Sequence, residues 1–238
     1  EFDIMGGEVK TYNPYTVPGL TDNVPAGVEF TEVVQRDGLG RPTQVKLQDG
    51  TSVYSYFNEE MVTVAYPAPD SSQVVGIASR SKDQANKEHR RIIDSLGRVI
   101  RVDEPTTNGL GPVAAPNQPT FYKYDGNNNL AKAIQSDGAN TQERMFKYDA
   151  LSRLTHEKQV EANATLNDAG SYVGASGSWT GFYKHDTESM LEYGVDANGV
   201  RTTYSYDGLH RVKNVTYSGE SGYETPSVTY NYDETENG

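Results

Sequence analysis

The chain of 238 residues contains no cysteine. This absence excludes disulfide bonds, thiolate nucleophiles and cysteine-ligated metal centres. Extracellular animal domains usually carry disulfides, so the absence favours a bacterial protein, which we expect to be secreted or at the cell surface. The sequence has no apolar run of about 18 residues and no visible signal peptide, so it predicts no transmembrane helix.

Motifs of the common catalytic sites are also missing. There is no GxSxG elbow, no Walker loop and no HExxH pair. The 33 acidic residues could supply carboxylates for glycoside hydrolysis, but no pair stands out by position. We therefore predict no catalytic residue, no cofactor site, no metal site and no enzyme activity. The four histidines, which do not have metal-ligand spacing, are His89, His156, His185 and His210.

Positive charge is in short supply. The 21 lysines and arginines against 33 acidic residues give a net charge of −12, which repels phosphate backbones and argues against nucleic acid as a partner. The local basic stretch from Lys87 to Arg91 fits a solvated start of a strand or a short helix.

Large aliphatic side chains are sparse for a thick two-layer core, whereas tyrosine is abundant, with 17 residues. Tyrosine can cover one face of a sheet while its hydroxyl stays in water or hydrogen-bonded. Together with a mean hydropathy of −0.71, this predicts a thin, curved sheet with the tyrosine face packed. Aromatic residues at periodic positions argue against continuous disorder.

The most prominent feature of the sequence is a recurring tyrosine–aspartate pattern. An alternating aromatic strand such as Thr202 to Tyr206 is followed by an aspartate, a turn, an arginine and a return strand such as Val212 to Tyr217. Each copy therefore predicts a β-hairpin. Eight copies align, including a degenerate one at Phe57. The defining residues are Asp37, Gly40, Arg41, Asp94, Gly97, Arg98, Tyr122, Tyr124, Asp125, Tyr148, Asp149, Arg153, Asp186, Tyr204, Tyr206, Asp207, Arg211, Tyr230, Tyr232 and Asp233.

The third residue after each aspartate is predicted to adopt a positive φ, as in a four- or five-residue hairpin loop. Glycine, asparagine and histidine suit this position, and glutamate and serine suit it less well. The well-suited residues are Gly40, Gly97, Asn128 and His210, and the poorly suited ones are Glu60, Ser152 and Ser189.

The recurring aspartate and arginine have two interpretations. In the first, the carboxylate accepts N–H groups of its own turn, and the arginine contacts that carboxylate or lies along the sheet. In the second, the carboxylates form a row of binding groups. The oxygen-rich segment Asp125–Asn129 likewise fits a turn or a calcium loop, although it lacks the closing glutamate.

An isolated hairpin is only marginally stable, so the hairpins are predicted to pair edge to edge in one continuous antiparallel sheet. Residues 1–32 form an extended lead-in that could hold one strand, and residues 33–238 form the repeat array. Loop insertions are expected near 67–86, 105–119 and 161–181, protruding from one edge, and the first could include a helical turn. Trp179, in the third insertion, either packs that loop onto the sheet or stacks on a sugar.

The pattern Tyr-x-Tyr-Asp-x-x-Gly-Arg-Leu resembles the YD repeat of the RHS (rearrangement hotspot) family. The resemblance covers the chain from about residue 33 onward and is carried most clearly by 36–41, 93–98, 148–153 and 206–211. It implies an all-β fold of tandem hairpins forming part of a spiralling hollow shell. In the family this shell encloses a C-terminal toxin in bacterial polymorphic toxins and insecticidal toxin complexes, and teneurins use a similar shell in cell adhesion.

The chain also departs from the family. It has about seven complete units, too few to close a large shell, and it lacks a recognisable plug with self-cleaving aspartates and a toxin domain. Because the last copy stops at Gly238, we expect the chain to be a piece of a longer protein. The resemblance implies a non-catalytic structural segment whose partners are further repeats of the same polypeptide and an enclosed toxin or effector. The alternative is an extracellular module that binds carbohydrate or a cell surface, motivated by the tyrosine-rich strands and Trp179.

Overall fold

The computed structural model describes residues 1–4, 6–16, 24–136, 140–219 and 224–232. Sixteen β-strands are hydrogen-bonded to one another in chain order, and the pairs whose register is defined are antiparallel. The tandem-hairpin, all-β fold is therefore confirmed. Among the described residues, no helix has the length and hydrophobicity needed to cross a bilayer.

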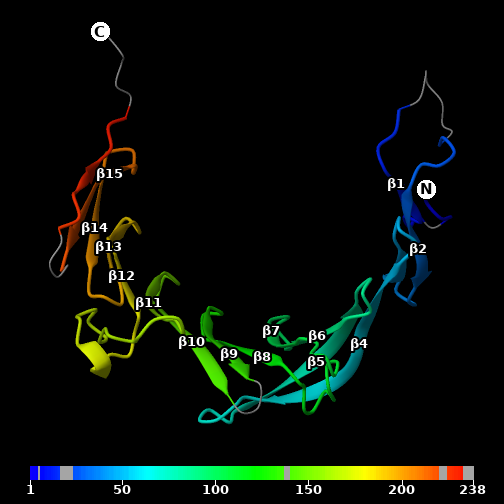
Figure 1. Cartoon of the computed structure of the whole chain (residues 1–238), viewed down its shortest axis with the longest axis horizontal. Coiled ribbons are helices and arrows are strands. Elements are labelled where there is room, and N and C mark those ends of the chain that lie inside the picture. Colours follow the sequence, from blue (N-terminus) through cyan, green and yellow to red (C-terminus); the bar gives the residue numbers. More distant parts are fainter. Residues whose placement is uncertain (5, 17–23, 137–139, 220–223, 233–238) are drawn as a thin grey trace, which may run out of the picture. The chain divides into compact units, whose positions relative to one another are not determined.

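The chain divides into two compact units, the first running from Glu1 to Phe121 and the second covering most of the residues from Tyr122 onward (Figure 1). The strands that begin in the first unit are β1 Lys10–Tyr12, β2 Phe30–Arg36, β3 Pro42–Lys46, β4 Ser52–Ala65, β5 Gln73–Lys82, β6 Glu88–Ile93, β7 Val99–Asp103 and β8 Pro119–Tyr124. The elements of the second unit are β9 Leu130–Ser136, β10 Thr141–Tyr148, β11 Leu154–Lys158, the 3-10 helix η1 Gly174–Ser176, β12 Gly181–His185, β13 Leu191–Val195, β14 Arg201–Tyr206, β15 Val212–Ser218 and β16 Val228–Thr229.

Antiparallel strands that follow one another in sequence must turn alternately at the two rims of their sheet. In each unit this places the turns of the tyrosine–aspartate pattern on one rim, which we call the aspartate rim. The turns that join one such hairpin to the next, and the loops after β7 and β11, lie on the opposite rim. The aspartate-rim turns begin at Asp37 and Asp94 in the first unit and at Asp125, Asp149, Asp186 and Asp207 in the second.

The core of the first unit lies on one face of β4 to β7. Along β4, Val62 and Val64 are buried, and the residues between and beside them point to the other face. Gly76 on β5 lies opposite Val62, and a Cβ there would come within 2.6 Å of Ile92 Cγ2 and 2.9 Å of Ile100 Cδ1. The absence of a side chain at Gly76 thus lets these two isoleucines fill the space.

The core of the second unit forms where the loop between β11 and β12 folds back. Leu166 and Trp179 from this loop pack against Val195 at the end of β13, with Phe182 and Tyr193 alongside. Leu166 is fully buried. A small core is therefore built by a loop and one end of the sheet, consistent with the sparse aliphatic content.

Segment 67–86, which the sequence indicated as a loop insertion, contains strand β5, paired with both β4 and β6. The helical turn suggested there does not form. Phe57 does not mark a turn either, because β4 continues past it, with a break in register between Tyr56 and Glu60 where Asn58 has a φ of 52°. The sequence pattern did not predict the long pair of strands β4 and β5, because this repeat is longer than the others and most of its residues are not typical of turns.

Candidate functional site

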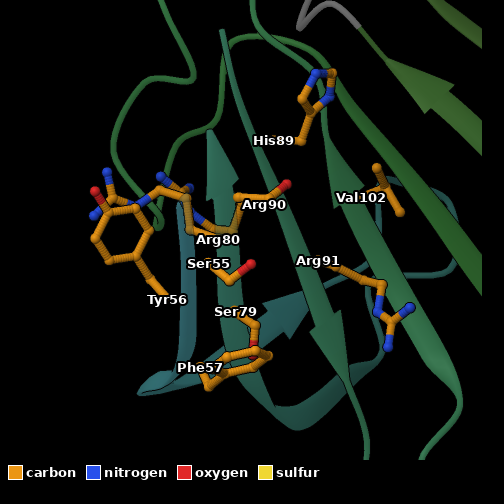
Figure 2. A pocket seen from close by; sticks show the side chains of 10 residues that line it. Ser55, Tyr56, Phe57, Ser79, Arg80, His89, Arg90, Arg91 and Val102 are labelled. Atoms are coloured by element: carbon orange, nitrogen blue, oxygen red, sulfur yellow. The ribbon is translucent and has the colours of Figure 1, made fainter. Parts of the chain in front are cut away.

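The first unit carries an open hollow of about 430 Å3 over β4 to β7. Figure 2 shows Tyr56 and Arg80 directed to one side of the strands, and Arg91 and Val102 directed to the other. The described residues gather no group of three histidine, aspartate or glutamate side chains that could hold a metal ion. The residues that line the hollow are Ser55, Tyr56, Phe57, Ser79, Arg80, Ser81, His89, Arg90, Arg91 and Val102.

The repeated aspartate closes its own turn through several hydrogen bonds. At Asp207, the Oδ1 atom accepts the backbone N–H groups of Leu209 at 2.9 Å and Arg211 at 3.0 Å, and Oδ2 accepts Arg211 Nε at 2.7 Å. The backbone N–H of His210 donates to the Asp207 carbonyl oxygen, and His210 has a φ of 63°. The carboxylate thus satisfies groups of its own loop.

The other turns of the aspartate rim repeat this geometry. The same Oδ1 contacts to the second and fourth following N–H groups occur at Asp37, Asp94, Asp125, Asp149 and Asp186, and an arginine Nε lies 2.7 Å from Oδ2 in Arg41, Arg98 and Arg153. The third residue has positive φ at Gly40, Gly97, Asn128, Ser152 and Ser189. The two serines therefore adopt the left-handed conformation that they were expected to fit poorly.

The electrostatics follow from these contacts. The Arg211 backbone N–H, supported by its guanidinium, holds the pKa of Asp207 below its usual value. At Asp125 the Asn129 side-chain amide takes the place of the arginine, donating to Oδ2 at 3.0 Å, and lowers the pKa of that carboxyl. Because donors of the turn already occupy both Asp125 oxygens, this segment has the geometry of the other turns.

The same turn also occurs on the opposite rim, where sequence reasoning missed it. Asp196 Oδ1 accepts the N–H groups of Asn198 and Val200, and Asn167 does the same for its own turn through a neutral amide oxygen. Asp83 Oδ1 accepts the N–H of Lys87. The available signal was an Asp or Asn followed three residues later by Asn or Gly, without the tyrosines that directed the search.

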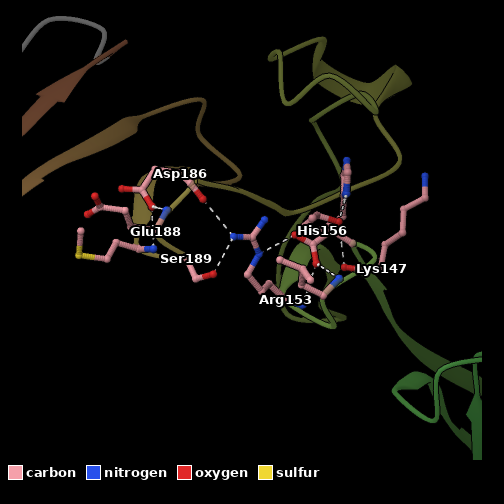
Figure 3. A network of polar contacts seen from close by, with 10 residues as sticks. Lys147, Arg153, His156, Asp186, Glu188 and Ser189 are labelled. Atoms are coloured by element: carbon pink, nitrogen blue, oxygen red, sulfur yellow. Dashed lines mark hydrogen bonds and ion pairs between the residues drawn. The ribbon is translucent and has the colours of Figure 1, made fainter.

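Neighbouring turns of the aspartate rim are joined in the second unit. Arg153 Nη1 donates to the Asp186 carbonyl oxygen at 3.1 Å and to Ser189 Oγ at 3.2 Å (Figure 3). His210 Nε2 lies 3.3 Å from Glu188 Oε2. The repeated arginine therefore serves its own turn and, at Arg153, the next turn along the rim.

The tyrosines of the pattern lie at the strand ends beside these turns. Tyr206 donates its hydroxyl to the Leu191 carbonyl oxygen at 2.9 Å. Tyr232 donates to Val212 O at 2.8 Å, and the Arg211 guanidinium lies over the Tyr232 ring at 4.2 Å. Tyr122 and Tyr124 lie in β8, Tyr148 ends β10, Tyr204 lies in β14 and Tyr230 follows β16, while Asp233 lies outside the described residues.

The basic stretch from Lys87 to Arg91, of which all but Lys87 lies in β6, is not simply solvated. Arg90 lies inside β6, and its Nη1 donates to Asp103 Oδ2 at 3.0 Å. Arg101 Nε donates to Asp103 Oδ1 at 2.8 Å, and Asp103 is fully buried. In the loop after β7, the Gly111 carbonyl oxygen accepts Arg90 Nη2 at 3.1 Å and the Val113 carbonyl oxygen accepts Arg101 Nη2 at 2.6 Å. The cluster thus fixes this loop over the sheet.

Trp179 packs a loop onto the sheet. Its side chain is buried beside Leu166, its ring lies 5.0 Å from the ring of His156, and Nε1 donates to Asp168 Oδ1 at 2.6 Å. A ring buried in this way has no free face to offer a sugar. The burial removes the observation on Trp179 that motivated the carbohydrate interpretation.

Replacing Asp207 by alanine is expected to accelerate amide exchange at Leu209 and Arg211, because their N–H groups lose their acceptor. Asp207→Asn should retain most of the protection, because Asn167 closes its turn with a neutral oxygen that lies 3.0 Å from each of the two N–H groups. Hydrogen exchange measured by NMR at these two amides checks the expectation. Equal exchange in the alanine variant and the unaltered chain would contradict it.

Comparison with known proteins agrees with this geometry. The RHS repeat family matches residues 192–222, which span β13 to β15. No curated protein matches the chain in sequence. The crystal structure of TcdB2-TccC3-TEV is similar over 95% of this chain, with a TM-score of 0.59 and 16% identity. That of TcdB2-TccC3 without its hypervariable C-terminal region is similar over 96%, with a TM-score of 0.57 and 12% identity.

The chain spans only about a tenth of those solved proteins, 10% and 11% of their lengths. At such low identity the likeness shows the fold alone. The family match, by contrast, falls on residues that carry the tyrosine–aspartate pattern itself, including Tyr204, Tyr206, Asp207 and Arg211. Residues 192–222 therefore match the RHS repeat, as the sequence pattern predicted.

Proposed function

We propose that this chain is a non-catalytic section of the wall of an RHS shell and that the shell encloses or presents another polypeptide, a toxin or effector. The RHS repeat and the fold shared with TcdB2-TccC3 support the structural role. The observation that carries the proposal is the arrangement of the recurrent polar residues. Their carboxylates and guanidiniums are used within and between turns, which leaves the repeats to build a wall.

Under this proposal, the partners of the chain are further repeats of the same polypeptide and the segment that the shell encloses. The protein acts after secretion or at the bacterial cell surface. A wall of this kind works by excluding proteases and solvent from what it surrounds. The function therefore predicts a pattern of protection in the intact protein and requires no reaction of its own.

The test is limited trypsin digestion of the native gene product purified from the organism that makes it, followed by peptide mass spectrometry. Peptides from outside the repeats should survive under native conditions and be cut once urea opens the array. Immediate native cleavage of everything outside the repeats, or a gene product that consists of this array alone, would overturn the enclosing role. A glycan array with the same preparation checks the carbohydrate alternative, which a clear signal would favour.

A further inference from the structure

The sheet of the first unit has one covered face and one bare face. Directly paired residues of antiparallel strands share a face. The register places Arg80, Arg90 and Asp103 on one face, where the loop after β7 lies over them through the Arg90 contact to Gly111. It places Ser79, Arg91 and Val102 on the other.

The bare face presents apolar side chains to solvent. Met61 on β4 pairs with Ile77 on β5, and Val75 lies two residues from Ile77 on the same face. The exposed fractions of these residues are 76%, 38% and 52% respectively. Large apolar side chains gathered on one face are typical of a surface that contacts another polypeptide. We call these three residues the apolar patch.

On this face the hollow of Figure 2 is lined by Ser79 and Arg91, whereas Tyr56, Arg80 and Arg90 of its lining belong to the covered face. Ser79 follows Ile77 by two residues on β5 and pairs with Arg91 of β6, so the apolar patch borders this part of the hollow along β5. The aromatic ring of Phe57 also lines the hollow. The Arg41 guanidinium lies over one face of this ring, 4.2 Å from its centroid. The hollow therefore combines an apolar wall with hydrogen-bond donors that a bound polypeptide could contact.

One cation in the hollow has no counter-charge among the residues that the structure describes. Arg80 is paired with Glu59 and Glu88, Arg90 with Asp103, and His89 with Glu104. Arg91 is exposed and makes no ion pair or hydrogen bond with any described residue. The chain has a net charge of −12, so acidic side chains that could pair with an arginine are in excess. A guanidinium that stays without an ion pair beside exposed apolar side chains therefore marks this part of the surface. A guanidinium presents its donors in a planar fork that fits a carboxylate.

We propose that the apolar patch and the hollow form a docking site for an extended polypeptide segment that carries apolar side chains and one carboxylate. The apolar side chains cover Met61, Val75 and Ile77, and the carboxylate pairs with Arg91, on the face that also carries Ser55 and Ser81. The occupant is a segment of the polypeptide that the shell encloses, so its source rests on the proposed function. A single carboxylate matches Arg91, the one cation of the hollow that lacks a partner among the described residues.

The test is a double-mutant cycle on the full chain. The probe is a fluorescent octapeptide of alternating leucine and serine with one serine replaced by glutamate, and its affinity is measured by anisotropy. Arg91→Gln should weaken binding at least tenfold, and replacing the peptide glutamate by glutamine should weaken it equally. Both changes together should cost no more than either alone, because they remove one interaction. Arg144→Gln, which alters an arginine of the second unit paired with Glu161, should leave the affinity unchanged.

Equal affinity of Arg91→Gln and the unaltered chain would overturn the proposal, as would tighter binding of a phosphoserine peptide or no binding of the glutamate peptide at millimolar concentration. Met61→Ser should weaken binding of both peptides to a similar degree, because it removes apolar contact only. The protease experiment is independent of this cycle. A coupled loss at Arg91 together with failed protection would leave the docking site standing and overturn the enclosed polypeptide as its source.

Discussion

Replacing Asp103 by alanine is expected to destabilise the first unit by about 3–5 kcal/mol, the usual cost of breaking a buried ion pair by removing one partner. The Asp103 side chain is fully buried, and the side chains of Arg90 and Arg101 are 10% and 4% exposed. Without the carboxylate, two guanidiniums remain buried and lack a counter-charge. The loop after β7 should also loosen, because both arginines hold its carbonyl oxygens.

Two readouts separate the units in this experiment. Hydrogen exchange of peptides from β5 to β7, followed by mass spectrometry across a urea series, reports on the first unit. The fluorescence of Trp179, the single tryptophan, reports on the second. The control is Glu59→Ala, which leaves Arg80 paired with Glu88 at a more exposed site and should cost no more than about 1 kcal/mol. An Asp103→Ala chain as stable as the control would contradict the expected result.

The hairpin repeat could be predicted from sequence because its chemistry is local. An aspartate, the N–H groups two and four residues later and the positive φ between them all lie within five residues, as at Asp207. Such contacts leave their mark in a short stretch of sequence. The two serines with positive φ show the limit of residue preference, because the hydrogen bonds of the turn hold Ser152 and Ser189 in a conformation that serine alone disfavours.

What could not be predicted depends on contacts between distant residues. Arg90 and Asp103 are thirteen residues apart in sequence and meet only because β6 pairs with β7. The strand character of β5 depends on pairing with β4 and β6, whereas its serines and glycine read locally as a loop. The bare face that carries Arg91 is likewise defined by register, since a shift of one residue would exchange the two faces.

Leu166→Ala is expected to destabilise the second unit by about 2–5 kcal/mol, because it removes a fully buried side chain and leaves a cavity in a small core. The backbone hydrogen bonds between Leu166 and Trp179 do not involve the leucine side chain, so the loss comes from packing. The urea midpoint of Trp179 fluorescence measures it directly, because the tryptophan packs in the same cluster. Leu166→Met, which nearly conserves volume, should cost less than about 1.5 kcal/mol.

The matched control is Leu209→Ala, a leucine of the same unit at the tip of an aspartate-rim turn. Its side chain is 73% exposed, so its removal should change the free energy of unfolding by no more than about 0.5 kcal/mol. If Leu166→Ala and Leu209→Ala were equally mild, the loop between β11 and β12 would contribute little to stability, and the hydrogen bonds of the strands and turns would carry the second unit. A large loss at Leu166 alone would instead show that the loop completes the core that the thin sheet lacks.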